Sequence, residues 1–94
     1  MLSEVGSALR RARIARGLTL KDVGVLSAGN FKPTAVAGYE RGERSISLER
    51  FCDLADLYGI APDVLLGEIL REVAGRPMVI VDLSELEERQ PRDA

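Results

Sequence analysis

The most informative part of the chain is Gly38-Tyr39-Glu40-Arg41-Gly42-Glu43-Arg44. It follows an apolar segment over residues 18–26 and a turn, and it precedes a second apolar segment over residues 48–58. Gly42 stands where a helix should stop, because glycine adopts the left-handed conformation after a helix without steric cost. The stretch therefore predicts the end of one helix and a tight connection to the next.

Apolar residues recur at helical spacing on both sides of this stretch, in five segments separated by turn residues. Ser3, Thr19 and Ser47 are suited to cap the first, second and fourth segments. The positions expected to face the core are Val5, Leu9, Ala12, Leu20, Val23, Leu26, Val36, Tyr39, Leu48, Phe51, Leu54, Ala55, Tyr58, Val64, Leu65, Ile69 and Val73. The pattern predicts an all-α domain over residues 1–75.

Composition narrows the classes of function. The 94 residues suffice for one domain, and 46% apolar and 30% charged residues are typical of a globular chain. The one cysteine, Cys52, excludes an internal disulfide. With no histidine, no glycine-rich phosphate loop and no metal-ligand cluster, we expect no enzyme, no cofactor and no metal site.

Nothing in the sequence indicates a membrane or an export signal. The longest apolar run, residues 78–81, is far too short to span a bilayer, and residues 1–16 lack a continuous apolar region. We therefore expect a cytoplasmic, nucleoid-associated protein.

The charge of the chain is divided between its two halves. Residues 1–50 carry nine Lys and Arg against five Asp and Glu, a balance of +4. Residues 51–94 carry four against ten, a balance of −6. The basic half is suited to phosphate. The acidic half either binds a protein partner or simply keeps the last helices soluble.

Residues 76–94 are expected to form a C-terminal extension of the domain. Met78-Val79-Ile80-Val81-Asp82-Leu83 has strand propensity, and residues 87–94 form a frayed acidic tail. A lone strand cannot satisfy its own backbone groups, so this segment needs a partner. The partner is either a second copy of the chain, which would make it a dimerisation strand, or the helical core, over which it would lie as a strap.

Over residues 3–70 the chain resembles the Cro/C1 (Xre) family of helix-turn-helix proteins. The resemblance is carried by Gly17-Leu18-Thr19 at the second helix and Tyr39-Glu40-Arg41-Gly42 at the end of the third. Tyr58-Gly59 and Lys32 add a closer similarity to BldD-type developmental repressors. The resemblance implies a five-helix Cro/C1-type domain with a short strand-like extension, and an ion pair between Arg13 and Glu40.

The resemblance also implies that the N-terminal part of the third helix enters the major groove of DNA. The positions that would face the bases are Lys32, Pro33, Thr34, Ala37 and Gly38. Lys32 could donate to guanine or only to a phosphate, and Thr34 could bind a base edge or touch a thymine methyl. Ala37 and Gly38 offer methyl contact and clearance. Few side chains of this helix can hydrogen-bond to bases, so we expect half-site spacing and DNA shape to contribute to sequence preference.

Residues suited to the DNA backbone surround this helix. The expected contacts are Arg41, Arg44, Ser45, Asn30 and Lys21. Arg10 and Arg16 are more peripheral, and for each arginine the alternative is a solvated surface charge. Leu20 stands where many relatives place a phosphate-binding glutamine.

These features predict a sequence-specific DNA-binding transcriptional regulator, a repressor, that recognises an inverted repeat in double-stranded DNA as a homodimer. The alternative is a protein-interaction module of the same fold, or an antitoxin-like protein whose acidic half binds a basic partner. Salt-dependent DNA binding would distinguish the two.

Overall fold

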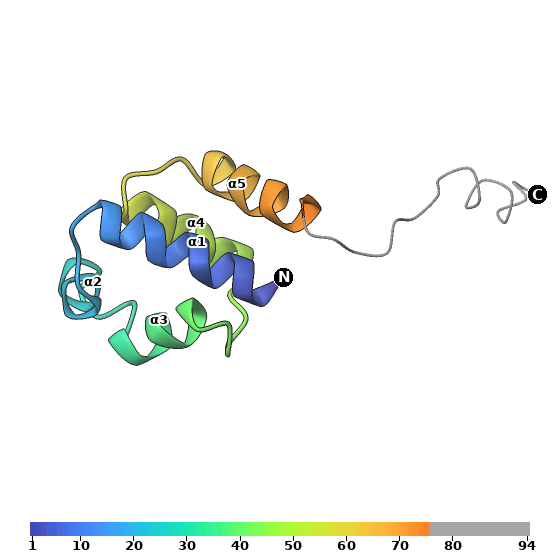
Figure 1. Ribbon diagram of the computed structural model, residues 1–94. Coiled ribbons are helices and arrows are strands. Elements are labelled where there is room, and N and C mark those ends of the chain that lie inside the picture. The colour runs from blue at the N-terminus through green and yellow to red at the C-terminus, as the bar shows by residue number, and fades with distance from the viewer. Residues whose placement is uncertain (76–94) are drawn as a thin grey trace, which may run out of the picture.

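The computed structural model describes residues 1–75, which form five helices and no strand (Figure 1). The helices are α1 (Leu2–Ala15), α2 (Leu20–Leu26), α3 (Pro33–Glu40), α4 (Leu48–Leu57) and α5 (Pro62–Ala74). The prediction of an all-α, five-helix domain is confirmed. The expected C-terminal extension, with its strand at 78–83, lies outside the described residues. Over the described range, no helix combines the length and apolar character that a membrane span requires.

Hydrogen-bonding side chains start α2 and α4. The Thr19 hydroxyl accepts from the Asp22 backbone N–H at 3.0 Å, and the Asp22 carboxylate accepts from the Thr19 N–H at 2.9 Å. These two bonds form a capping box. The bond from the Thr19 backbone N–H to the Asp22 carboxylate lowers the pKa of Asp22, because it stabilises the charged form. Ser47 caps α4 by accepting from the Arg50 N–H at 3.1 Å.

The remaining helix ends follow backbone preferences. Pro33 is the first residue of α3, where its missing N–H costs nothing. Gly42 follows α3 with a φ of 74°, as its position predicted. The prediction for Ser3 was wrong: α1 begins at Leu2, Ser3 lies inside it, and Met1 precedes it without a side-chain cap.

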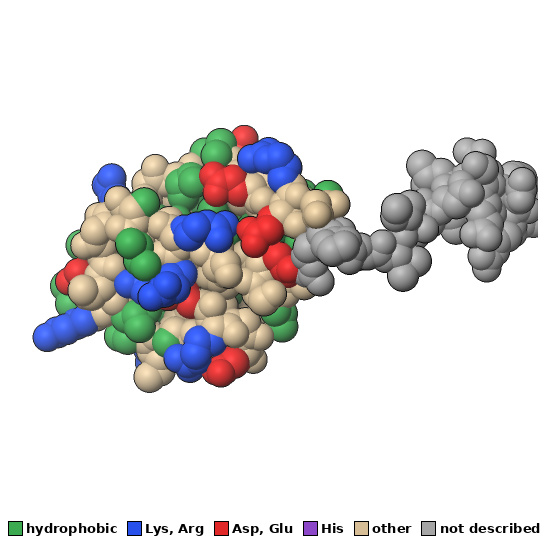
Figure 2. Space-filling model, in the orientation of Figure 1, with side chains coloured by type: hydrophobic (Ala, Val, Ile, Leu, Met, Phe, Trp, Pro, Cys, Tyr) green, Lys and Arg blue, Asp and Glu red, His purple; other side chains and the backbone are tan. Residues whose placement is uncertain are grey.

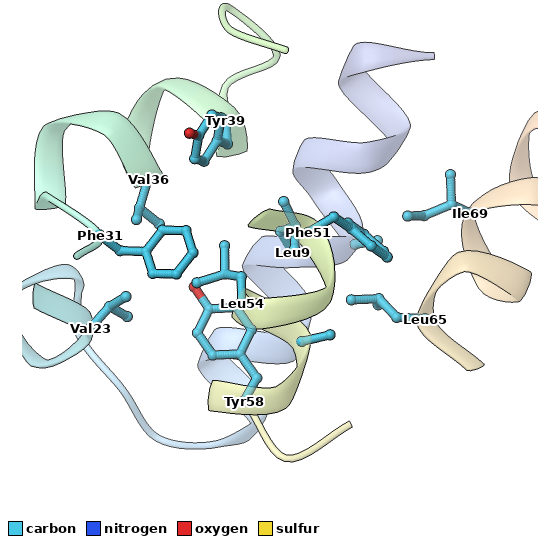
Figure 3. Packing of buried hydrophobic residues seen from close by; sticks show 12 residues of the cluster. Leu9, Val23, Phe31, Val36, Tyr39, Phe51, Leu54, Tyr58, Leu65 and Ile69 are labelled. Carbon is cyan, nitrogen blue, oxygen red and sulfur yellow. The ribbon is translucent and has the colours of Figure 1, made fainter. Parts of the chain in front are cut away.

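A single apolar core joins all five helices (Figure 3). The buried side chains are Ala8, Leu9, Val23, Phe31, Val36, Tyr39, Phe51, Leu54, Ala55, Tyr58, Leu65 and Ile69. Phe31 lies in the α2–α3 turn, and its ring is directed toward Val23, Val36 and Leu54 (Figure 3). Phe31 therefore anchors the turn in the core, while Ala28, Gly29 and Asn30 are exposed.

Three residues that were expected to face the core are exposed. Leu26, Leu48 and Val64 have exposed fractions of 57%, 68% and 49%. Each lies at an end of its helix: Leu26 is the last residue of α2, Leu48 the first of α4, and Val64 is in the first turn of α5. Periodicity identifies the inner face of a helix, but the core covers only the middle of these short helices.

Helices α1 and α3 cross closely at Gly6. A Cβ atom at Gly6 would lie 2.5 Å from the backbone carbonyl oxygens of both Tyr39 and Glu40. Glycine is therefore required at this point of α1, because any side chain would push the last turn of α3 away. The sequence analysis did not single out Gly6, since its partner is far away in the chain.

We expect Gly6→Ala to lower the free energy of unfolding by about 1–3 kcal/mol, the usual cost of overpacking. Gly67→Ala is the matched control. Its Cβ would approach only the flexible end of Arg71, and alanine in the interior of α5 should raise stability by roughly 0.5–1 kcal/mol. Urea unfolding followed by circular dichroism measures both variants. Equal effects of the two substitutions would contradict the close crossing.

Candidate nucleic-acid interface

Arg13 and Glu40 form the ion pair that the family resemblance implies. Arg13 Nε donates to Glu40 Oε2 at 2.7 Å and Nη2 donates to Oε1 at 3.0 Å, while Nη1 donates to the Leu18 carbonyl at 2.8 Å. The two side chains are only 11% and 6% exposed. The hydrogen bond to Glu40 raises the pKa of Arg13. The guanidinium thus connects α1, the start of the α2 region and the end of α3.

Tyr58 lies beside this pair at the end of α4. Its hydroxyl is buried and has no hydrogen-bond partner among the described residues. Burial, followed by the negative charge of Glu40, raises the pKa of Tyr58. The phenol of Tyr58 is therefore neutral beside the Glu40 carboxylate. The cation that pairs with Glu40 is Arg13.

The start of α3 is the exposed end of the predicted reading helix. Lys32, Pro33 and Thr34 are all exposed, and Ala37 on the next turn is half-buried. Val36 and Tyr39 are buried and hold the opposite side of the helix against the core, as their spacing predicted. The helix thus presents its first turn outward.

Gly38 has a different environment from the one predicted for a base-facing position. It is buried, and a Cβ there would lie 2.7 Å from Arg44 Cδ. The Arg44 side chain lies over it, with its guanidinium carbon 5.8 Å from the centre of the Tyr39 ring. Gly38 therefore provides clearance for Arg44, which remains exposed at the end of α3.

Further basic side chains lie along the outer surface of α1 and α3. Arg41 is exposed and pairs with Glu43 at 3.1 Å, a surface contact that contributes little to stability. A hollow between α1, α2 and α3 is lined by Arg10, Arg41, Leu20 and Ala37 together with the paired Arg13 and Glu40. Figure 2 shows Lys and Arg side chains, with some acidic ones, over the face that carries α1 and α3. The fold thus brings Arg10 next to α3, although the sequence analysis placed it at the periphery.

The other predicted backbone contacts are accessible but more dispersed. Lys21, Asn30 and Ser45 are exposed. Arg16 is also exposed, but it lies against Gly59, just after α4. A Cβ atom added at Gly59 would be 3.2 Å from the Arg16 guanidinium. The structure does not bring Arg16 together with the residues at the start of α3.

The turn between α2 and α3 contains two consecutive residues with positive φ. Ala28 has a φ of 55° and Gly29 a φ of 81°. For alanine this conformation costs about 1–2 kcal/mol. Ser27 holds the turn from inside: its hydroxyl donates to the Gly24 carbonyl at 3.2 Å and accepts from the Phe31 N–H at 3.0 Å.

Arg50 is a residue of this region that the sequence analysis missed. Its Nη2 donates to the Asn30 carbonyl at 2.8 Å, and its guanidinium carbon lies 4.2 Å from the centre of the Phe31 ring. One signal was available: the third position of a capped helix favours Glu or Gln, and here it carries an arginine.

A family model described as a helix-turn-helix domain matches residues 4–69. The chain belongs to the helix-turn-helix domain family. The matched residues contain α2, the α2–α3 turn and α3, together with all of the buried core side chains named above. Within the described part of the chain, no group of three or more residues could hold a metal ion.

Two solved structures of DNA-binding domains resemble this domain. The BldD DNA-binding domain from S. venezulae is 38% identical, with a TM-score of 0.64, and the match covers 68% of this chain and 93% of that one. A crystal structure of the DNA-binding domain of BldD is also 38% identical, with a TM-score of 0.65 and coverage of 68% and 90%. No curated protein matches the chain. The predicted resemblance to the Cro/C1 (Xre) family and to BldD is confirmed.

We expect Arg13→Met or Glu40→Met alone to lower the free energy of unfolding by about 3 kcal/mol, because each leaves a buried charge without its partner. The double variant should lose less than the sum of the two. Arg11→Met is the control, since the Arg11–Glu72 pair is 56% and 41% exposed and should contribute less than about 1 kcal/mol. Urea unfolding measures the free energy of unfolding of the four variants. A double variant that loses as much as the two single variants together would argue against the pair.

Proposed function

We propose that this domain is a sequence-specific DNA-binding transcriptional regulator, a repressor that binds an inverted repeat as a homodimer. The observation that carries the proposal is the exposed first turn of α3, with Lys32 and Thr34 outward and the opposite side fixed in the core. An α-helix held in this way fits the major groove. The similarity to the BldD DNA-binding domain supports the same function.

Bases are read by few side chains in this proposal. Lys32 donates to guanine or to the adjoining phosphate, and Thr34 contacts a base edge or a thymine methyl. Pro33 and Ala37 contribute only apolar surface. Sequence preference therefore comes partly from the shape of the DNA and the spacing of its half-sites.

The DNA backbone is bound by cations on both sides of α3. Arg44 and Arg41 act at its C-terminal end, and Ser45 adds a neutral donor beyond it. Arg10 lines the same hollow as Arg41 and Ala37, so it supplies a phosphate contact where Leu20 has no donor. The weak Arg41–Glu43 surface pair gives way to a phosphate at little cost.

Dimerisation would use the far side of the domain, around α5. Leu48, Leu66 and Leu70 are exposed there, and the first two border an apolar hollow lined by Val5, Ile46, Phe51 and Ile69. A second copy that covers this surface would present two reading helices, about 34 Å apart for successive turns of one DNA face. A bound dimer would repress by occupying the promoter.

Selection of bound duplexes from a random-sequence pool, followed by salt titration, tests DNA binding. We expect an inverted repeat to be enriched. Arg44→Ala should reduce the slope of log K against log salt by about 0.9, the value for one phosphate contact. If Lys32 contacts a phosphate, Lys32→Ala should reduce the salt slope by the same amount. If Lys32 contacts guanine, Lys32→Ala should weaken the preference for that base by about 1–3 kcal/mol. Arg11 lies on the α5 side of α1, so Arg11→Ala should change neither the salt slope nor the preference for any base. Absence of both enrichment and salt-dependent binding would favour the protein-interaction module.

Sedimentation with and without the selected duplex tests the dimer. We expect two copies per inverted repeat, and Leu66→Glu or Leu70→Glu should abolish cooperative binding because each places a charge in an apolar interface. Ile14→Glu, at a 51% exposed apolar position of α1 outside this surface, is the matched control for the added charge. Retention of two-copy binding by both α5 variants would exclude this surface.

A further inference from the structure

Arg50 belongs to α4, but its side chain forms a hydrogen bond and a ring contact with the α2–α3 turn. Its guanidinium donates to the Asn30 carbonyl at 2.8 Å and stacks over the Phe31 ring with 4.2 Å between its central carbon and the ring centre. These contacts cross 20 residues of sequence and end immediately before Lys32 and α3. Arg50 therefore contacts the backbone that introduces the reading helix.

The position of Arg50 is unfavourable for a cation on local grounds. It lies in the first turn of α4, where the helix dipole favours negative charge. It has no ion-pair partner among residues 1–75 within 4.0 Å. Nothing within α4 therefore favours an arginine at this position. The contacts of Arg50 with Asn30 and Phe31 do favour one.

The turn that Arg50 contacts needs support from outside. Ala28 holds a positive φ, which a residue with a side chain rarely adopts. From within the turn, the Ser27 hydroxyl binds the Phe31 N–H and the Ser27 carbonyl accepts from the Asn30 N–H at 3.0 Å. Arg50 adds a hydrogen bond to the Asn30 carbonyl from outside the turn. A planar guanidinium can donate and stack at the same time, which a lysine ammonium cannot.

We propose that Arg50 is a positioning residue for DNA reading. By holding the Asn30 carbonyl and the Phe31 ring, it fixes the direction in which Lys32 and Thr34 leave the core, and it does so without touching DNA. This proposal rests on the proposed function of the domain, which it deepens by adding a residue that determines specificity.

Arg50→Lys and Arg50→Met test the proposal in DNA binding. We expect each to weaken binding to the selected inverted repeat about tenfold, the loss of one charge-assisted hydrogen bond. Binding to a scrambled duplex should change much less, and the salt slope should not change. Arg11→Met removes a charge elsewhere on the domain and should leave both affinities as they are.

Three results in this experiment would overturn the proposal. Full binding by Arg50→Lys would show that charge alone is needed. A salt slope reduced by about 0.9 in Arg50→Met would show a direct phosphate contact. Unchanged affinity of both variants would show that the turn needs no support from α4. Circular dichroism establishes that each variant is folded, and Arg50→Gln replaces Arg50→Met if the latter is not.

Amide hydrogen exchange tests the same contact without DNA. In Arg50→Met the Asn30 and Phe31 amides should exchange about tenfold faster because the turn opens more often. The Leu54 amide, in the core part of α4, should keep its rate. Unchanged exchange at the turn would overturn the proposal. If the wild-type protein binds no DNA but the turn amides respond as expected, the proposed function fails and the contact of Arg50 with the turn stands.

Discussion

The close crossing of α1 over the end of α3 is the constraint on which the rest of the domain depends. Gly6 allows the two backbones to meet at the Tyr39 and Glu40 carbonyls, and two turns later Arg13 holds the Glu40 carboxylate. One contact limits how close the helices come, and the other limits rotation of α3 about its axis, because a bidentate pair has a fixed geometry. The outer side of α3 is thereby set before any ligand is present.

Most of the fold was predictable because its signals are local. Thr19, Ser47, Pro33 and Gly42 act on neighbouring backbone groups, so their roles at helix ends can be read from the sequence. Apolar spacing identified the inner faces of the helices, and it failed for Leu26, Leu48 and Val64 because it does not show where along a helix the core ends.

The candidate site was less predictable because its contacts are distant in sequence. The Arg13–Glu40 pair was implied by a family pattern and not by spacing. Gly6, the hollow next to Arg10 and the contact of Arg50 with Asn30 all depend on which helices meet. Gly38 shows the same limit: its position in α3 predicted a DNA contact, but its neighbour in space is Arg44.

The placement of Arg44 has a consequence for how DNA association would divide between enthalpy and entropy. A free arginine side chain has many rotamers, and holding it on a phosphate reduces that freedom at a cost of about 0.5–1.5 kcal/mol. Here the aliphatic part already lies in the space above Gly38 and the guanidinium near the Tyr39 ring. Contacts formed on folding thus already restrict part of this side chain, which would reduce the entropy that it loses on binding a phosphate. The missing side chain of Gly38 leaves the space for those contacts.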